Sequence, residues 1–205
     1  METTVLANAT GFQVGRRGMY GPACDYVRKM AHLLPPDQML STGLVDYALG
    51  AAPHTGAFVI VYEENPLKQV QLSYYKIGEG PFYVFYTPFH LPQLEIPLTV
   101  ARAVLFRDAT VAPQGRPVCD ALAFAKRDMK AGDILDGLGG FACYTLLENY
   151  DVSRRENGLP MGVSEGCRLK RNIAKDQLVT YADVDLPKDR LCDKLRKEQD
   201  DYFQK

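Results

Sequence analysis

The sequence contains no tryptophan, three histidines and five cysteines, and no two cysteines form a Cys-x-x-Cys pair. A zinc site needs clustered Cys and His ligands, but His32, His54 and His90 lie far from the cysteines along the chain. An odd number of widely spread cysteines argues against a disulfide framework. It favours reduced thiols in a cytoplasmic protein.

Charge of one sign and long apolar runs are also lacking. The 24 Lys and Arg residues nearly balance the 25 Asp and Glu residues, so no basic footprint for nucleic acid is present. No apolar run approaches the length of a membrane span. The first twelve residues, METTVLANATGF, lack the basic n-region of a secretory signal. We therefore expect neither a nucleic-acid partner nor a membrane partner.

What is present is ordinary for a globular protein. Hydrophobic residues make up 46% of 205 residues, enough to bury a core in one large domain or two small ones. The segment 2–12, ETTVLANATGF, predicts the last turns of a helix closed by Gly11. A domain rarely begins with a helix end, so we expect this chain to be part of something longer.

The first half of the chain predicts an antiparallel sheet with helices. Pro22 and the helical spacing of Cys24, Val27 and Leu34 predict a helix up to Pro35-Pro36. A second helix is expected from Gln38 to Leu49. Three strands joined by short turns then suggest a meander, followed by another helix. The expected strands are 57–63, which is apolar on both faces and therefore buried, 69–75 and 82–88, and the expected helix is 93–106.

The segment GRPVCD, residues 115–120, marks a boundary in composition. Beyond it, short apolar pairs alternate with Gly, Asp, Asn and Lys, which predicts many short strands with tight turns. The last residues are charged and helix-prone. The fold class is therefore α+β, and the expected domains are 1–116, a small all-β domain over 117–187, and a charged C-terminal helix over 188–205.

Two stretches of this second half nearly repeat each other. KRDMKAGDIL, residues 126–135, and KRNIAKDQLV, residues 170–179, share a Lys-Arg pair, an acid or amide, an apolar residue, a polar turn and two apolar residues. Each unit reads as strand, turn, strand and is too small to bury its apolar face alone. Two copies can pack about a pseudo-twofold axis and share one core.

The two repeats lie in segments that resemble a known module. VCDALAFAKRDMKAGDILDGLGG and LPMGVSEGCRLKRNIAKDQLVTYADVDLP are similar to the SAF domain, an antifreeze-like β-clip module also found in sialic acid synthases, altronate dehydratases and flagellar P-ring chaperones. The second copy has Lys175-Asp176 where the family often has a glycine. We expect a more strained turn there, since Asp tolerates a positive φ less well than Gly.

The upstream segments extend the resemblance to nearly the whole chain. LANATGF, GRRGMYGP, YYKIGEGPFYVFYTPFHLPQLEIPLTVARAVL and LRKEQD are similar to the C-terminal portion of homoserine-dehydrogenase-like, SAF-domain-containing NAD(P)-dependent oxidoreductases. One branch of these is reductoisomerase-like and uses NADPH and a divalent metal. The resemblance implies an NAD(P) cofactor, allows a divalent metal, and implies a homo-oligomer.

Such an oxidoreductase begins with a Rossmann domain, which needs Gly-x-Gly-x-x-Gly after a strand. This sequence has no such motif; GLGGF, residues 137–141, lies inside the SAF-like region and reads as a turn. Hydride transfer needs the nicotinamide held against the substrate carbon. We therefore expect this chain to be inactive alone and to act with a Rossmann partner, in cis or in trans.

Candidate catalytic residues cluster in YYKIGEGPFYVFYTPFHLPQLE. Lys76 precedes a Gly-flanked turn and either polarises a carbonyl or lies on the surface. His90 is either a catalyst or a packed imidazole. Glu95 needs a partner, for which Arg102 at a spacing of seven is the structural alternative. Tyr75 and Tyr86 are candidates for hydrogen bonding to substrate, or else core aromatics.

Further candidates for binding an anionic or hydroxylated substrate are basic. Arg16 and Arg17 lie in a glycine-rich loop, as an anion clamp or as solvated charges. The basic pairs of the two repeats either line a groove for the ligand or are edge-strand charges that block aggregation. These residues are Lys126, Arg127, Lys170 and Arg171.

Two classes of function stay open at this point. The first is the substrate-side and SAF portion of an NAD(P)-dependent oxidoreductase acting on a small hydroxy or keto compound. The second is a non-catalytic module whose SAF domain binds a sugar-like ligand or supports oligomers. In both, exposed aromatic residues of the 57–89 region are expected to drive self-association.

Overall fold

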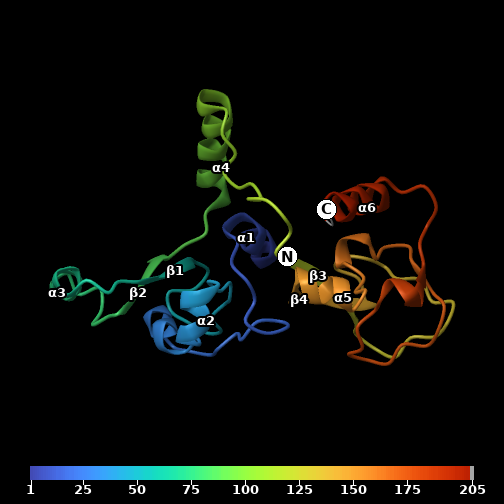
Figure 1. The fold of residues 1–205 in the computed structure, drawn as a ribbon, viewed down its shortest axis with the longest axis horizontal. Coiled ribbons are helices and arrows are strands. Elements are labelled where there is room, and N and C mark those ends of the chain that lie inside the picture. The colour runs from blue at the N-terminus through green and yellow to red at the C-terminus, as the bar shows by residue number, and fades with distance from the viewer. Residues whose placement is uncertain (204–205) are drawn as a thin grey trace. The chain divides into compact units, whose positions relative to one another are not determined.

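The computed structural model describes residues 1–203 and divides into two compact units (Figure 1). Unit 1 combines Met1–Gly18 with Pro113–Lys205, and unit 2 is Met19–Ala112. Over the described residues the chain is α+β, with two-stranded antiparallel sheets and a C-terminal helix. Compact units need not coincide with evolutionary domains, so the predicted division into 1–116, 117–187 and 188–205 stays a prediction.

Unit 2 is built on one hairpin. Strands β1 (Ala57–Tyr62) and β2 (Phe82–Thr87) pair antiparallel from Ala57 opposite Thr87 to Tyr62 opposite Phe82. One face packs on the 3₁₀ helix η1, and Phe58, Ile60 and Val84 belong to that small core. The other elements are η1 (Val27–His32), α2 (Pro36–Ser41), α3 (Pro66–Tyr74), α4 (Pro92–Ala101) and the π-helical turn η2 (Arg102–Phe106).

The expected strand 69–75 is wrong, because residues 69–74 belong to helix α3 and Tyr75 is its C-cap. The missed signal is Asn65-Pro66: the Asn65 side chain accepts a hydrogen bond from Leu67 N at 3.0 Å, and proline follows at the first helical position. An Asn N-cap with Pro at N1 starts a helix more strongly than alternation favours a strand. The sheet is therefore a two-stranded hairpin, not a three-stranded meander.

Three other expectations for unit 2 are corrected. The segment 22–34 forms only the short η1, because Cys24 N and Val27 N donate to Leu49 O and Ala52 O at 3.0 Å, which places residues 23–26 beside 49–52 in extended backbone. The helix expected over 38–49 is limited to α2 for the same reason. β1 is not buried on both faces: Val59 and Val61 are exposed.

Unit 1 contains the terminal helices and the repeat region. Strands β3 (Cys119–Ala125) and β4 (Cys143–Asn149) pair antiparallel along their full length. Helix α1 (Glu2–Thr10) ends as predicted, with Gly11 in the left-handed region at φ 80°. The remaining elements are α5 (Tyr150–Arg155), η3 (Met161–Val163), β5 (Arg168–Leu169), η4 (Tyr181–Asp183), β6 (Val184–Asp185) and α6 (Leu191–Phe203), the predicted C-terminal helix.

The two repeats pair with each other about a pseudo-twofold axis, as predicted. Met129 N donates to Ile173 O at 2.8 Å, and Ile173 N donates to Met129 O at 3.0 Å. The same exchange recurs with side chains. Ala131 N donates to Asn172 Oδ1 at 2.9 Å, and its counterpart Lys175 N donates to Asp128 Oδ1 at 2.8 Å. Each of these bonds thus has a counterpart 44 residues away in the other copy.

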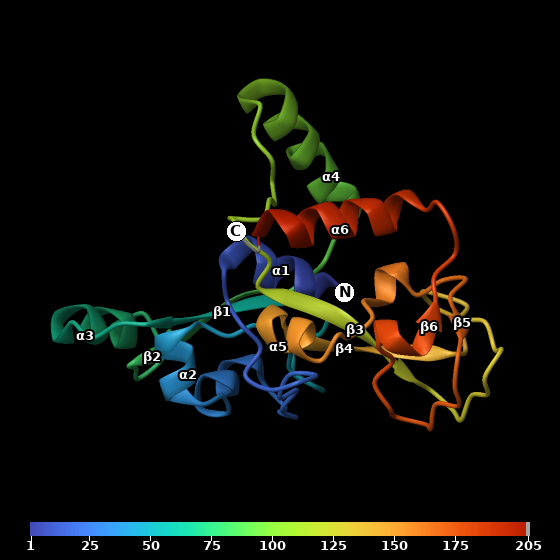
Figure 2. The ribbon, with the colours of Figure 1, turned by 45° about the vertical axis from the view of Figure 1, so that its right-hand side comes forward.

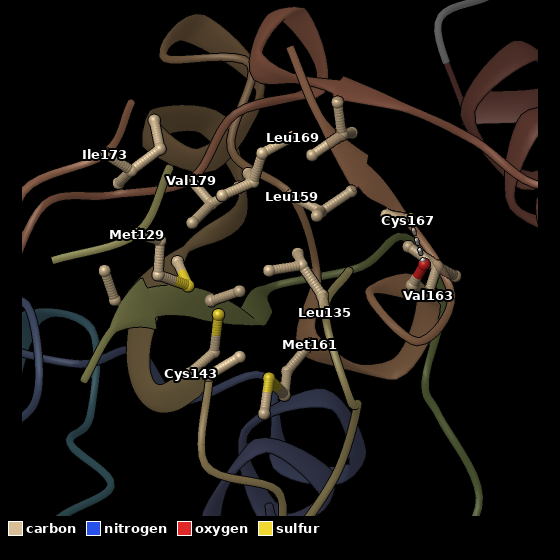
Figure 3. Packing of buried hydrophobic residues seen from close by; sticks show 14 residues of the cluster. Met129, Leu135, Cys143, Leu159, Met161, Val163, Cys167, Leu169, Ile173 and Val179 are labelled. Atoms are coloured by element: carbon tan, nitrogen blue, oxygen red, sulfur yellow. Dashed lines mark hydrogen bonds between the residues drawn. The ribbon is translucent and has the colours of Figure 1, made fainter. Parts of the chain in front are cut away.

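The repeats also share one core, shown in Figure 3. Met129, Leu135, Ile173 and Val179, which occupy matching positions of the two copies, are all at most 2% exposed. The turns differ as expected: Gly132 has φ 92°, and Asp176 in the matching position has φ 64°. A non-glycine residue in the left-handed region is strained by about 1–2 kcal/mol. The match in backbone pairing fits a duplicated unit.

Candidate functional site

A cationic and phenolic cluster lies on the η1 side of the hairpin in unit 2. Arg28, from η1, donates through Nη1 to the backbone oxygen of Lys76 at 2.7 Å. Its guanidinium lies 5.9 Å from the ring centre of Tyr86. The Tyr86 hydroxyl lies 3.1 Å from that of Tyr26. Of these four residues, sequence reasoning identified Lys76 and Tyr86. Arg28 and Tyr26 gave no signal, because both sit in a segment read as an ordinary surface helix.

The electrostatics of this cluster suit an anionic ligand. The Nε atom of Arg28 is buried and has no hydrogen-bond partner in the protein, so it is a donor still to be satisfied. The hydrogen bond with Tyr86 is the main cause that raises the pKa of Tyr26, so the Tyr26 phenol keeps its proton near pH 7. Lys76 is exposed, with φ 57° in the left-handed region.

The other face of the hairpin carries a cavity of about 320 Å³ between α3 and the strands. Tyr75 lines this cavity, so the structure does not bring it together with Tyr86, whose ring faces η1. At the rim Lys68 Nζ lies 3.1 Å from Glu63 Oε2. The Tyr83 hydroxyl is buried and has no hydrogen-bond partner in the protein. The lining is Val61, Glu63, Lys68, Gln71, Leu72, Tyr75, Tyr83 and Phe85.

His90 and Glu95 come together, but at the surface. His90 Nδ1 lies 3.6 Å from Glu95 Oε2, and the two side chains are about half exposed or more. The expected structural pair of Glu95 with Arg102 does not form within the protomer, because Arg102 pairs with Asp108 instead. The catalytic role of His90, Glu95 and Lys76 stays a prediction.

In unit 1, Arg17 holds the loop after α1 in place. Its Nε donates to Glu148 Oε2 at 2.7 Å and its Nη2 to Glu156 Oε2 at 2.5 Å. Burial lowers the pKa of Arg17, but the two carboxylates outweigh this and raise it above its ordinary value. The neighbouring Arg16 is exposed. Arg17 therefore already has two anionic partners in the protein, and binding of substrate by either arginine stays a prediction.

The basic pairs of the two repeats do not converge. Because the copies run antiparallel through Met129 and Ile173, their Lys-Arg pairs lie on opposite sides of that bridge. Each of the four side chains also has a partner nearby. Lys126 Nζ donates to Gly140 O, Arg127 lies 4.0 Å from Asp133, Lys170 lies 3.6 Å from Asp185, and Arg171 binds Asp183 at 2.5 Å. Their role in ligand binding stays a prediction.

Comparison with known families finds a match between residues 1–96 and the family model described as "Oxidoreductase DRL, catalytic domain". Residues 1–96 are similar to an oxidoreductase catalytic domain. This oxidoreductase segment covers slightly less than half of the chain and contains Arg28, Tyr26, Lys76 and Tyr86. No curated protein matches the chain.

The residues do not fit a complete cofactor or metal site. Among residues 1–203, no group of three or more His, Cys, Asp or Glu side chains is arranged to hold a metal ion. The described sheets are all two-stranded and antiparallel, whereas a dinucleotide fold needs parallel strands with a helical crossover. Binding of NAD(P) or of a divalent metal stays a prediction.

Two cysteines of unit 1, Cys119 and Cys143, are unsuited to act as nucleophiles. Cys119 and Cys143 are buried, and desolvation raises the pKa of the Cys119 thiol to about 12 and that of Cys143 to about 11. A thiol with so high a pKa is a poor nucleophile near pH 7.

No helix within residues 1–203 has the length and apolar character that crossing a bilayer requires.

Asp183 gives unit 1 a defined pH dependence. Burial would raise the pKa of Asp183, but hydrogen bonds from Arg171 and Thr180 outweigh this and lower it. Its stabilising contribution is therefore present above the unfolded-state pKa of about 3.9 and is lost as pH falls through the lower folded-state value. Asp183→Asn should cost about 1–3 kcal/mol near neutral pH, with a flatter loss of stability below about pH 4.

Urea midpoints measured across this pH range check the prediction. The matched control is Asp185→Asn, since Asp185 is 69% exposed and its ion pair with Lys170 is long at 3.6 Å. That variant should differ from wild type by no more than about 0.5 kcal/mol. An Asp183→Asn variant with the acid profile of the wild type would show that another group dominates.

Proposed function

We propose that this chain is the substrate-side portion of an NAD(P)-dependent oxidoreductase that acts on a small, anionic hydroxy or keto compound, such as a phosphorylated one. The observation that carries the proposal is the family match over residues 1–96, which spans the Arg28 cluster. In this reading unit 1 contributes a SAF-type β-clip. The exchange of backbone bonds between the two repeats supports that assignment.

The residues of the cluster divide the work of binding. The unsatisfied Nε of Arg28 and the ammonium of Lys76 take the anionic group, since an arginine donor and a lysine point charge both favour phosphate or carboxylate. The hydroxyls of Tyr86 and Tyr26 share one hydrogen bond, and the hydroxyl that accepts in it donates its own proton to the hydroxyl or carbonyl oxygen of the substrate. Donors placed where charge develops stabilise the transition state more than the ground state.

The hydride must come from a nicotinamide held elsewhere. We propose that a Rossmann domain, in cis or in trans, supplies it and that NADPH does not bind this chain alone. The test compares two samples: the isolated chain, and the chain fused at Met1 to the nucleotide-binding domain of an oxidoreductase of the matching family. We expect NADPH to leave the thermal unfolding midpoint of the first unchanged, and the second to oxidise NADPH with a phosphorylated hydroxyketone.

Lys76→Ala in the fused protein should lower kcat/KM by about 100-fold, because it removes a cationic donor next to the reacting group. The matched control is Lys29→Ala, a lysine of the same unit whose ammonium pairs with Asp25 at 2.7 Å; this variant should retain wild-type kcat/KM. Equal activity of the two variants would remove Lys76 from the site. A clear midpoint shift of the isolated chain with NADPH would overturn the two-part arrangement. Binding of a sugar-like ligand without turnover by the fused protein would favour the non-catalytic module instead.

A further inference from the structure

Unit 2 has an exposed apolar helical surface that the proposed function does not use. We call the exposed large apolar side chains of residues 94–106 the α4–η2 surface. Each of these side chains is between 55% and 73% exposed. Its members are Leu94, Ile96, Leu98, Val100, Val104, Leu105 and Phe106. Figures 1 and 2 show α4 standing apart from the hairpin of its own unit. A helix that is apolar around its circumference is normally buried, so this one lacks its neighbour.

We propose that the α4–η2 surface pairs with the same surface of a second copy of this chain, antiparallel about a twofold axis. Between residues 93 and 106 the charged side chains are Glu95 and Arg102, seven residues or about two turns apart on one side of the helix. In a twofold pairing, a contact of one residue with a second residue of the other copy occurs twice, once from each copy. Glu95 of one copy then lies opposite Arg102 of the other, twice.

The apolar residues fit the same pairing. Leu94, Leu98, Ala101 and Leu105 follow the 4-3-4 spacing of a helix–helix seam. In an antiparallel register Leu94 faces Leu105 of the second copy and Leu98 faces Ala101. Each facing pair is therefore apolar. Glu95 and Arg102 directly follow Leu94 and Ala101. They therefore flank the seam on the same edge, where interhelical ion pairs form.

Nothing within the protomer holds these charges strongly. Glu95 has the 3.6 Å contact with His90, and Arg102 pairs with Asp108, all at side chains that are roughly half exposed. Exposed pairs of this kind contribute little and can exchange partners. Seven large apolar side chains also suit the demand of a specific dimer, about 800 Å² per partner. An apolar patch of that size is rare on a monomer and marks an interaction site.

The test exchanges charges on the purified full chain and measures dimerisation by sedimentation equilibrium. Wild type should be a dimer. Glu95→Arg places four arginines along the seam and Arg102→Glu places four glutamates there, so each variant alone should dimerise at least about tenfold more weakly. An equimolar mixture of the two should form a heterodimer about as tight as wild type, because each arginine then faces a glutamate.

The mixture distinguishes contacts between two copies from the contacts that Glu95 and Arg102 make within one protomer. Mixing two variants can restore the former but not the latter. Glu64→Arg, a charge reversal at an exposed site elsewhere in unit 2, should leave the wild-type dimer intact. A wild-type monomer, or two variants that stay apart when mixed, would overturn the proposal. The experiment requires no turnover, so its failure is distinguishable from a failure of the proposed oxidoreductase function.

Discussion

Replacing Arg196 by alanine is expected to lower the free energy of unfolding of unit 1 by about 3–5 kcal/mol. Arg196, from α6, binds both carboxylate oxygens of Asp120 at 2.8 Å and lies 3.3 Å from Asp200. The side chains of Arg196 and Asp120 are 15% and 9% exposed. Figure 2 shows α6 running alongside β3, which carries Asp120. Removing the guanidinium leaves the buried carboxylate of Asp120 without its cation, whereas Asp200 keeps Arg154 at 2.6 Å.

The size of this effect follows from burial. Burial lowers the pKa of Arg196, yet the hydrogen bonds and charge of Asp120 outweigh it and raise that pKa well above its ordinary value. The ring of Tyr150 lies 5.5 Å from the guanidinium, and its hydroxyl donates to Asp200 at 2.6 Å. Without Arg196, Asp200 would keep Tyr150 and Arg154, but Asp120 would keep only the hydroxyl of Ser153. A buried partner left alone costs the full desolvation of its charge.

Hydrogen exchange of the Cys119–Ala125 strand measures this loss within unit 1. Arg155→Ala is the matched control, since Arg155 is an exposed arginine on neighbouring α5; its effect should stay within about 0.5 kcal/mol. A double-mutant cycle with Asp120→Ala should show strong coupling, because Asp120→Ala removes the same pair. Additive effects would mean that Arg196 acts mainly through its aliphatic packing.

Leu135→Ala is expected to lower the free energy of unfolding of unit 1 by about 2–5 kcal/mol. Leu135 is 1% exposed and belongs to the core that the two repeats share (Figure 3). The substitution removes buried methyl groups and leaves a cavity that the paired backbones on either side cannot close. Urea unfolding, followed by exchange of the same strand, provides the measurement.

The adjacent residue supplies the control for this second prediction. Ile134 is 54% exposed, and Ile134→Ala should change stability by no more than about 0.5 kcal/mol. Val179→Ala, at the position matching Leu135 in the other repeat, should weaken the same cooperative unit, since Val179 is fully buried in the same core. If Leu135→Ala cost no more than Ile134→Ala, the repeats would not share one core in solution.

Much of unit 1 was predictable because its signals are local and repeated. The duplicated Lys-Arg segments, 44 residues apart, predicted a paired unit with one core, and Met129 opposite Ile173 confirms it. The helix end at Gly11 was predictable because only a left-handed residue closes that turn without strain. The strained turn at Asp176 followed from the missing glycine.

The errors in unit 2 have two physical causes, one local and one long-range. Residues 69–75 alternate like a strand, but the Asn65-Pro66 cap upstream starts a helix and α3 continues it. The segments 22–34 and 38–49 have helical spacing, yet their backbone donors and acceptors bond to each other across more than twenty residues. Partners at such a distance override local propensity, since each buried backbone group must be paired.

By itself the sequence determined the α+β class, the duplicated core and the absence of a Gly-x-Gly-x-x-Gly motif, because periodicity and glycine placement act over a few residues. Only the tertiary structure decided which side chains meet. It placed Arg28 against Lys76 and Tyr86, gave Glu148 and Glu156 to Arg17, and left Glu95 and Arg102 facing solvent. Such contacts join residues tens of positions apart, and no local pattern fixes the geometry of a charge and its distant partner.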